Sequence, residues 1–115
     1  MTTTQEVVNH HLDCFGKGDI EGLLSDYTND SILVTPMGTM DNLPALREGF
    51  GQLVAEFGQD GVTFEMGDVH IADDVAMVTW SADTPNNTYH FATDTFLIRN
   101  GKIERQTFTA HVTPK

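Results

Sequence analysis

Apolar and polar positions follow two different periods along this chain. In the first half, apolar side chains recur every three or four residues, which predicts helices, and from residue 62 onward the period changes to two, which predicts strands. Helices are expected over residues 3–15, 19–27 and 43–57. Strands are expected over residues 31–35, 62–71, 75–83, 88–99 and 102–112.

Residues at the ends of the helices support these limits. Thr3 with Glu6 three residues later is a capping-box pattern, and Gly18 follows the first helix, where a left-handed residue commonly ends one. Either Asp41 or Asn42 is placed to cap the third helix. Helices followed by a run of strands predict an α+β fold, with the helices on one face of an antiparallel sheet.

The last hairpin decides which side chains of the sheet share a face. A two-residue turn at Asn100 and Gly101 would pair Arg99 with Lys102. A three-residue loop, with Gly101 left-handed in a bulge, would pair Ile98 with Lys102 instead. A slip of one residue moves every side chain of one strand to the other face, so the two turns predict different surfaces.

We favour the bulged loop because of the cross-strand pairs that it creates. It sets Thr93 opposite Thr107, and Asp94 opposite Gln106, where the two polar side chains can form a hydrogen bond. The face expected to wall a pocket then carries His90, Ala92, Asp94, Phe96, Gln106, Phe108 and Ala110. The other, Thr-rich face carries Thr93, Thr95, Leu97, Ile103, Arg105, Thr107, Thr109 and His111.

Composition narrows the classes of function. A length of 115 residues, 39% of them hydrophobic, predicts a single domain over residues 1–115. Six basic against 17 acidic residues give a net charge of −11, which disfavours nucleic acid and anionic membranes as partners. The single cysteine excludes an intrachain disulfide. The N-terminus lacks signal-peptide features and no apolar run approaches the roughly 18 residues that span a bilayer, so we expect a cytoplasmic protein.

Five motifs follow one another at defined places in the chain. They are GDIEGLL at 18–24, YTNDS at 27–31, PMG at 36–38, ALREGF at 45–50 and DTFLIRNGKI at 94–103. Their order resembles that of the nuclear transport factor 2-like superfamily, whose branches include the SnoaL-like polyketide cyclases and the ketosteroid isomerases. The resemblance implies a cystatin-like, ketosteroid isomerase-like cone, in which a curved antiparallel sheet wraps around N-terminal helices and leaves an apolar pocket. It also implies a dimer.

The resemblance assigns expected roles to three positions. The isomerases use a carboxylate base just before the Pro-x-Gly turn, a phenol on the first helix and a protonated Asp on a late strand. Those positions hold Thr35, His11 and Asp94 in this chain. A threonine hydroxyl is far too weakly basic to replace the carboxylate, so the isomerase mechanism does not carry over, whereas Asp94 is retained and His11 is a titratable substitute for the phenol.

Asp94 is the strongest candidate for a catalytic residue. It lies in mid-strand between Ala92 and Phe96 on its own face, where burial would raise its pKa and would make an ionised carboxylate costly without hydrogen bonds. His11 lies on the apolar stripe of the first helix and could exchange a proton with Asp94 across the pocket. Alternatively, both are core residues whose hydrogen bonds are satisfied.

The other candidates are expected to bind a ligand. His90 shares the face of Asp94 at roughly 13 Å, and Trp80 is either a core residue or a stacking surface. His10 points about 100° away from His11 and is expected to be solvated, and Cys14 is expected to be a small buried hydrophobe. No metal-ligand spacing or phosphate-binding loop is present, so neither a metal nor a cofactor is expected. The expected binding residues are Thr35, Trp80, His90, Phe96, Gln106 and Phe108.

The sequence leaves three classes of function open. The first is an enzyme that isomerises, cyclises or dehydrates a small apolar molecule by proton transfer through Asp94 and His11. The second is a non-catalytic binding module for such a molecule. The third is a dimeric interaction domain whose cone is filled by Phe57, Phe64 and Trp80. In each case the Thr-rich outer face of the sheet is suited to contact with a second subunit.

Overall fold

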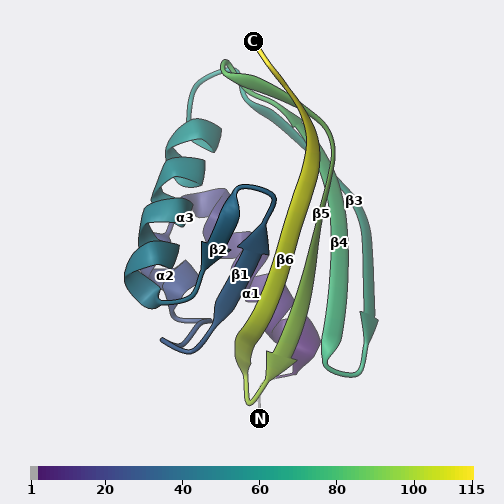
Figure 1. Cartoon of the computed structure of the whole chain (residues 1–115). Coiled ribbons are helices and arrows are strands. Elements are labelled where there is room, and N and C mark those ends of the chain that lie inside the picture. The colour runs from purple at the N-terminus through teal and green to yellow at the C-terminus, as the bar shows by residue number, and fades with distance from the viewer. Residues whose placement is uncertain (1–2) are drawn as a thin grey trace.

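Three helices pack against one curved sheet in the computed structural model, which describes residues 3–115 (Figure 1). The helices are α1 (Thr4–Lys17), α2 (Ile20–Leu24) and α3 (Leu43–Phe57). The strands are β1 (Ile32–Thr35), β2 (Gly38–Met40), β3 (Thr63–Ala72), β4 (Val75–Asp83), β5 (Asn87–Arg99) and β6 (Lys102–Pro114).

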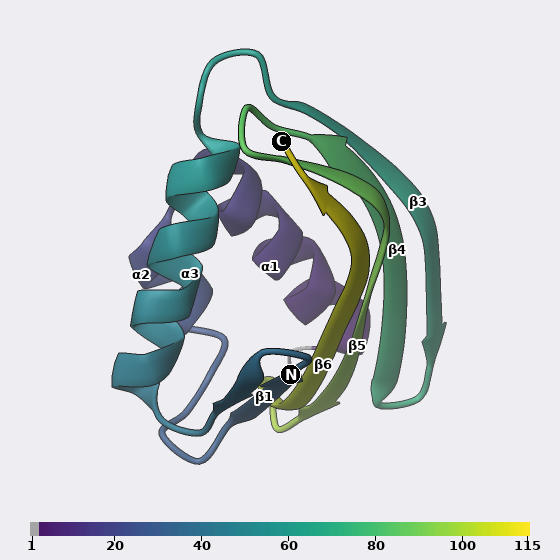
Figure 2. The ribbon, with the colours of Figure 1, turned by 45° about the horizontal axis from the view of Figure 1, so that its top comes forward.

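The strands lie in the order β2-β1-β6-β5-β4-β3. Strands β1 and β6 run parallel and the other neighbours are antiparallel. Figure 2 shows the sheet curving around the helices without closing on itself, with α1 inside the curve and α3 facing the β1 and β6 side. The α+β cone expected from the sequence is therefore confirmed.

The helix ends follow the capping residues. Thr3 and Glu6 form the predicted capping box, and Gly18 ends α1 in the left-handed conformation with φ of 69°. Asn42 rather than Asp41 caps α3, by accepting a hydrogen bond from the backbone N–H of Ala45. Strand β2 was not expected, because three residues are too few to show an alternating pattern.

The last hairpin differs from the predicted bulged loop. Ile98 pairs with Ile103 and Arg99 with Lys102, so Asn100 and Gly101 form a two-residue turn with positive φ at both. The extra residue lies one step further on, at Glu104 in β6, because Leu97 already pairs with Arg105. The bulge thus exists, but in the strand and not in the loop.

The displaced bulge preserves most of the predicted faces. Asp94 stands opposite Phe108 rather than Gln106, two residues from the predicted partner, so its face is unchanged. Ile103 is the exception, because it lies before the bulge and is fully buried on the concave side instead of on the outer face.

A second bulge moves His90 out of the predicted pocket face. Tyr89 pairs with Val112 and Phe91 with His111, which leaves His90 as the extra residue of β5. Tyr89 is buried and His90 is exposed, so the prediction that His90 shares the concave face with Asp94 is wrong. The His90 ring instead lies against that of His111, with 4.6 Å between the centroids, and contacts the Thr113 hydroxyl at 2.8 Å.

The core fills the space between the helices and the concave face of the sheet. Apolar side chains from every layer are almost wholly buried there, and they hold the first helix against the middle strands. The most deeply buried large side chains are Val7, Val8, Leu23, Leu46, Val78, Phe96 and Ile103.

Candidate functional site

Asp94 lies on the concave face of β5 with a neutral hydrogen-bond donor on each carboxylate oxygen. The Trp80 indole N–H donates to Oδ2 at 2.9 Å, and the Gln106 side-chain amide donates to Oδ1 at 3.0 Å. The predicted contact between Asp94 and Gln106 is therefore present, although the two residues are diagonal neighbours in the ladder. Among the ion pairs of residues 3–115, none includes Asp94.

The hydrogen bonds continue from Gln106 to the first helix. The Tyr27 hydroxyl donates to the Gln106 side-chain oxygen, and Nδ1 of His11 lies 3.4 Å from the Tyr27 oxygen. Because the Tyr27 proton is given to Gln106, the remaining hydrogen bond requires His11 to donate from Nδ1. His11, Tyr27 and Gln106 thus all donate in the direction of Asp94, which is the acceptor at the end of the chain.

Burial and hydrogen bonds determine whether the groups of this hydrogen-bond network carry a proton. Burial raises the pKa of Asp94 above its ordinary value, against the lowering effect of the hydrogen bonds from Trp80 and Gln106. Burial also lowers the pKa of His11 to about 4, with a smaller contribution from His10, so His11 is neutral near pH 7. The pKa of the Tyr27 hydroxyl is raised well above its ordinary value, chiefly by burial.

His11 and Asp94 therefore share one network without touching. Two residues, Tyr27 and Gln106, join them. The His11 ring is enclosed by aromatic edges, with Phe96 at 5.2 Å and Phe50 at 6.1 Å between centroids. His11 stabilises the network from inside the core. Because Tyr27 and Gln106 lie between them, His11 and Asp94 do not exchange a proton directly across a pocket, although this had been expected.

A cleft of about 680 Å³ opens beside this network, between α3, the β1–β2 hairpin and the last part of β6. Its walls are mainly apolar, and it is open to solvent on one side. Its lining side chains include Thr35, Met40, Glu48, Leu53, Glu56, Tyr89 and Phe108.

The predicted binding residues divide between this cleft and the surrounding core. Thr35 lines the cleft, where its hydroxyl caps the β1–β2 turn by donating to the Gly38 carbonyl at 3.0 Å. Phe108 also lines it and lies directly opposite Asp94 in the sheet. Asp94 is thus next to a residue of the cleft wall but is not itself one of the lining residues.

Three predicted binding residues lie behind the wall. Trp80 stacks on Phe108, with ring centroids 6.1 Å apart and planes 17° apart, and also bonds to Asp94. Gln106 is buried in the network, and Phe96 is buried in the core against His11. Neither Phe96 nor Gln106 is among the residues that line the cleft.

The aromatic residues predicted to fill the cone do meet at one end of it. Phe57 lies 5.6 Å from Trp80 and 6.4 Å from Phe64, and Phe64 stacks on Trp80 at 5.4 Å. They fill the end nearest the last turn of α3, while the cleft remains open on the other side of Phe108. The cone is therefore partly filled and partly open.

Sequence reasoning missed Glu56 and Tyr89, which line the cleft and bond to each other. The Tyr89 hydroxyl donates to Oε1 of Glu56 at 2.9 Å. Thr84 and Asn87 donate to Oε2 at 2.7 Å and 2.9 Å. The available signal was the spacing of Glu56 on α3, three residues after Leu53 and thus on a neighbouring part of the same face. The bulge that turns Tyr89 inward left no pattern in the sequence.

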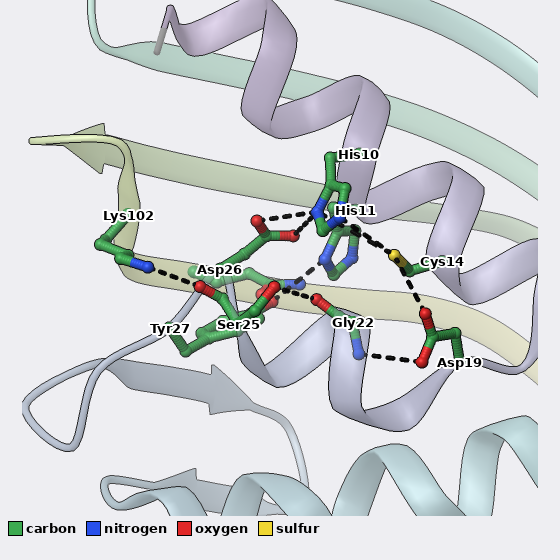
Figure 3. A network of polar contacts seen from close by, with 10 residues as sticks. His10, His11, Cys14, Asp19, Gly22, Ser25, Asp26, Tyr27 and Lys102 are labelled. Atoms are coloured by element: carbon green, nitrogen blue, oxygen red, sulfur yellow. Dashed lines mark hydrogen bonds and ion pairs between the residues drawn. The ribbon is translucent and has the colours of Figure 1, made fainter. Parts of the chain in front are cut away.

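A second polar cluster lies between α1 and the turn that follows α2, on residues that the sequence did not indicate as a site (Figure 3). Nε2 of His10 lies 3.4 Å from the Cys14 sulfur, and Nδ1 lies 2.8 Å and 2.9 Å from the two oxygens of Asp26. His10 and Cys14 share a face of α1 because they are four residues apart. His10 is exposed, as expected, but its ring also contacts Asp26 and Cys14, which the sequence did not indicate.

The order of thiol, imidazole and carboxylate in this cluster does not make Cys14 a nucleophile. Burial raises the pKa of the Cys14 thiol, and the carboxylates of Asp19 and Asp26 raise it further, so the thiol keeps its proton. With the Nδ1 atom of His10 directed at Asp26, its Nε2 atom faces the Cys14 sulfur. The cluster ties α1 to the turn that follows α2, and Cys14 is buried as expected.

Within residues 3–115, no group of three or more His, Cys, Asp or Glu has a geometry that could hold a metal ion. No helix in this part of the chain is long and apolar enough to cross a membrane.

Solved structures share this fold at low sequence identity. A putative polyketide cyclase from Sinorhizobium meliloti is 19% identical, with a TM-score of 0.72 over 90% of this chain and 93% of that one. The epoxide hydrolase/cyclase-like enzyme SalBIII, described in pyran ring formation of salinomycin, is 19% identical, with a TM-score of 0.79 over 97% and 95%. A putative ketosteroid isomerase from Kribbella flavida is 10% identical, with a TM-score of 0.75 over 94% and 77%.

Comparison of the sequence with protein families identifies the family of this chain. No curated protein matches it. The model of the SnoaL-like domain matches residues 8–106, which is most of the chain and includes most of α1, the cleft helix α3 and Asp94. The solved structures above agree with this match in fold. The chain therefore belongs to the SnoaL-like domain family, within the nuclear transport factor 2-like superfamily.

Proposed function

We propose that this protein is a small-molecule enzyme that binds an apolar organic compound in the cleft and exchanges a proton with it through Asp94. The observation that carries the proposal is a half-buried carboxyl group with two neutral donors, no cationic partner within residues 3–115 and a raised pKa, beside an apolar cleft. Isomerisation, cyclisation and dehydration all need such a group, and none of them needs a cofactor.

The two donors suit Asp94 to this role. Trp80 and Gln106 each occupy one lone-pair position of the carboxylate, and each oxygen retains a second position for a substrate proton. A neutral environment without Lys or Arg leaves the carboxylate basic, because an adjacent cation would lower its pKa. Tyr27 and His11 hold Gln106 in place and act as positioning residues.

Phe108 controls the path from the cleft to Asp94. It lines the cleft and faces Asp94 across the ladder, where opposite Cβ atoms lie about 5 Å apart. The substrate reaches the carboxylate when the Phe108 ring turns away from it. This covering ring also favours a second candidate function, in which the protein binds the ligand without reacting, because Asp94 does not line the cleft in the present arrangement.

Proton exchange tests the catalytic function without knowledge of the natural substrate. The protein is incubated in D₂O with a panel of small cyclic ketones and enones, and loss of the α-proton signal is followed by NMR. Exchange on at least one compound is expected, and Asp94→Asn is expected to slow it by roughly a hundred-fold or more. Asp60→Asn, which removes an exposed carboxylate, is the matched control and is expected to leave the rate unchanged.

Two results would count against the proposal. If Asp94→Asn keeps the wild-type exchange rate, Asp94 is not the proton-transfer group. If the compounds bind but no exchange occurs in the wild type, the non-catalytic function is favoured. Mass spectrometry of a co-purified ligand would then identify the compound that the cleft holds.

We also propose that the protein forms a homodimer through the convex face of the sheet. This face carries the predicted Thr-rich surface, and apolar side chains are exposed on it at Val75, Met77 and Phe91. An apolar patch rimmed by polar residues is typical of protein interfaces.

A further inference from the structure

The charges around the cleft restrict the ligands that it can hold. Within the described part of the chain, its charged lining residues are Glu48 and Glu56, and it is lined by no Lys, Arg or His. The other walls are apolar or neutral, with Met40, Leu53 and Phe108 among them. An anionic ligand would lose its hydration shell here and face two carboxylates without any compensating cation.

Glu56 is a negative charge whose contacts are all neutral. Its three hydrogen bonds come from the side chains of Tyr89, Thr84 and Asn87, and the ion pairs found in residues 3–115 do not include it. Oε1 accepts one bond and Oε2 accepts two, so Oε1 retains a free position. Partly buried carboxylates are ordinarily paired with a cation, and a ligand can supply the one that the protein omits.

The carboxylate of Glu56 is ionised at neutral pH. Burial alone would raise its pKa, but the hydrogen bonds from Asn87, Thr84 and Tyr89 outweigh burial and lower the pKa below its ordinary value. The Tyr89 ring, adjacent to this charge on the cleft wall, provides a surface that attracts cations. Glu48 lies about 12 Å away along the same helix and adds a second negative charge towards the other end.

We propose that the cleft selects apolar molecules that carry a protonated amine, with the ammonium group bound at Glu56 beside the Tyr89 ring. This inference rests on the proposed function, because it names the class of ligand for the same cleft. The apolar part of the ligand lies against Leu53 and Phe108, and the ammonium N–H donates to the free position on Oε1 of Glu56. Neutral compounds of the same shape bind more weakly, and carboxylates are excluded.

Glu56 also has a structural role, which the experiment must separate from ligand selection. Its bonds to Thr84 and Asn87 join the last turn of α3 to the β4–β5 loop. In Glu56→Gln the side-chain oxygen can still accept hydrogen bonds, but the charge is lost. Glu48→Gln removes the exposed charge from the same cleft with no such bonds to disturb.

The experiment compares three naphthalenes that differ in one substituent: aminomethyl, hydroxymethyl and carboxyl. Binding to the full chain is measured by calorimetry at physiological salt, which screens long-range attraction to the acidic protein. We expect the wild type to bind the amine about ten-fold more tightly than the alcohol, the size of one charge-assisted hydrogen bond, and the carboxylate weakest of all. Glu56→Gln is expected to remove the preference for the amine while keeping the affinity for the alcohol.

Glu65→Gln is the matched control, because it changes the net charge equally on an exposed site away from the cleft. It is expected to keep the ten-fold preference, and Glu48→Gln is expected to reduce it in part. If wild type binds the amine and alcohol equally, or if Glu65→Gln loses as much preference as Glu56→Gln, the inference is wrong. In both cases binding of the alcohol would leave the proposed function standing. If Glu56→Gln does not fold, complete loss of the preference in Glu48→Gln overturns the inference, because the ammonium group is then bound at Glu48 and not at Glu56.

Discussion

Two carboxylates on the inner side of this protein accept hydrogen bonds from uncharged side chains. Asp94 and Glu56 are both carboxylates on the inner side of the molecule, and both are bonded to hydroxyl, amide or indole groups and not to Lys or Arg. The balance differs between them, because burial raises the pKa of Asp94 while hydrogen bonds lower that of Glu56. Asp94 is thereby suited to take up a proton and Glu56 to remain charged.

The raised pKa of Asp94 gives a pH dependence of stability with a definite sign. A carboxyl group whose pKa is higher in the folded state binds its proton more tightly there, so the penalty for its charge is fully present above the folded pKa. This penalty disappears as the pH falls towards the unfolded pKa of about 3.9. Relative to Asp94→Asn, we expect the wild type to gain free energy of unfolding as the pH falls from 7 to 4, towards the unfolded pKa, measured by urea denaturation.

The same measurement on Asp60→Asn accounts for the change in net charge. Its difference from wild type is expected to vary less with pH than the difference for Asp94→Asn. A wild type that loses stability relative to Asp94→Asn over this range would contradict the raised pKa of Asp94 and, with it, the role proposed for that residue.

At the level of helices and strands, most of the fold could be predicted because periodicity and capping residues agree. The three helices and the four long strands lie within a few residues of their predicted limits, since each presents an apolar face to one core. The two β5 and β6 bulges could not be predicted, because one extra residue leaves the alternation intact on either side of it. His90 and Ile103 were therefore placed on the wrong face.

The site was predicted in part for the same reason. The contact between Asp94 and Gln106 depends on residues sharing a face, which the alternating pattern determines. The cleft wall formed by Glu56 and Tyr89 depends on how far α3 stands from the sheet and on a bulge, and neither is encoded in local periodicity. His11 was expected to meet Asp94 directly, but Tyr27 and Gln106 occupy the space between them.

Strand β3 has a bulge of its own, at Gly67 and Asp68, which depends on a glycine. A Cβ atom at Gly67 would collide with the Thr79 hydroxyl, which accepts a hydrogen bond from the Asp68 N–H at 2.8 Å. Gly67→Ala is therefore expected to lower the free energy of unfolding by about 2 kcal/mol, as overpacking commonly does. Chemical denaturation measures this change.

Gly16 offers the matched control for the same substitution. It lies inside α1, and a Cβ atom there would meet nothing within 4 Å. Gly16→Ala is expected to raise the stability by about 0.5–1 kcal/mol through helix propensity. Equal effects of the two substitutions would show that the close approach at Gly67 does not limit the fold.

For the whole molecule, the net charge of −11 opposes the proposed dimer. Two copies that associate through the convex face bring together like charges, which salt screens. We expect the dimer fraction in sedimentation to rise with salt, and Met77→Glu to shift the protein to monomer, because Met77 is 36% exposed on that face. Met37→Glu, at the 97% exposed tip of the β1–β2 turn, is expected to leave the dimer intact. Dissociation by both variants alike would argue against this interface.

The bulge at His90 affects which sequence changes this protein can accept during evolution. On the loop side of the bulge, β5 contributes Asn87 and Tyr89 to the cleft wall, and on the other side it contributes Asp94 to the network behind it. Because the alternation is reset between the two parts, residues can be gained, lost or exchanged near the loop without turning Asp94 out of the interior. Under the proposed function, residues near the loop end of this strand could therefore be exchanged to alter ligand choice while Asp94 keeps its place in the interior.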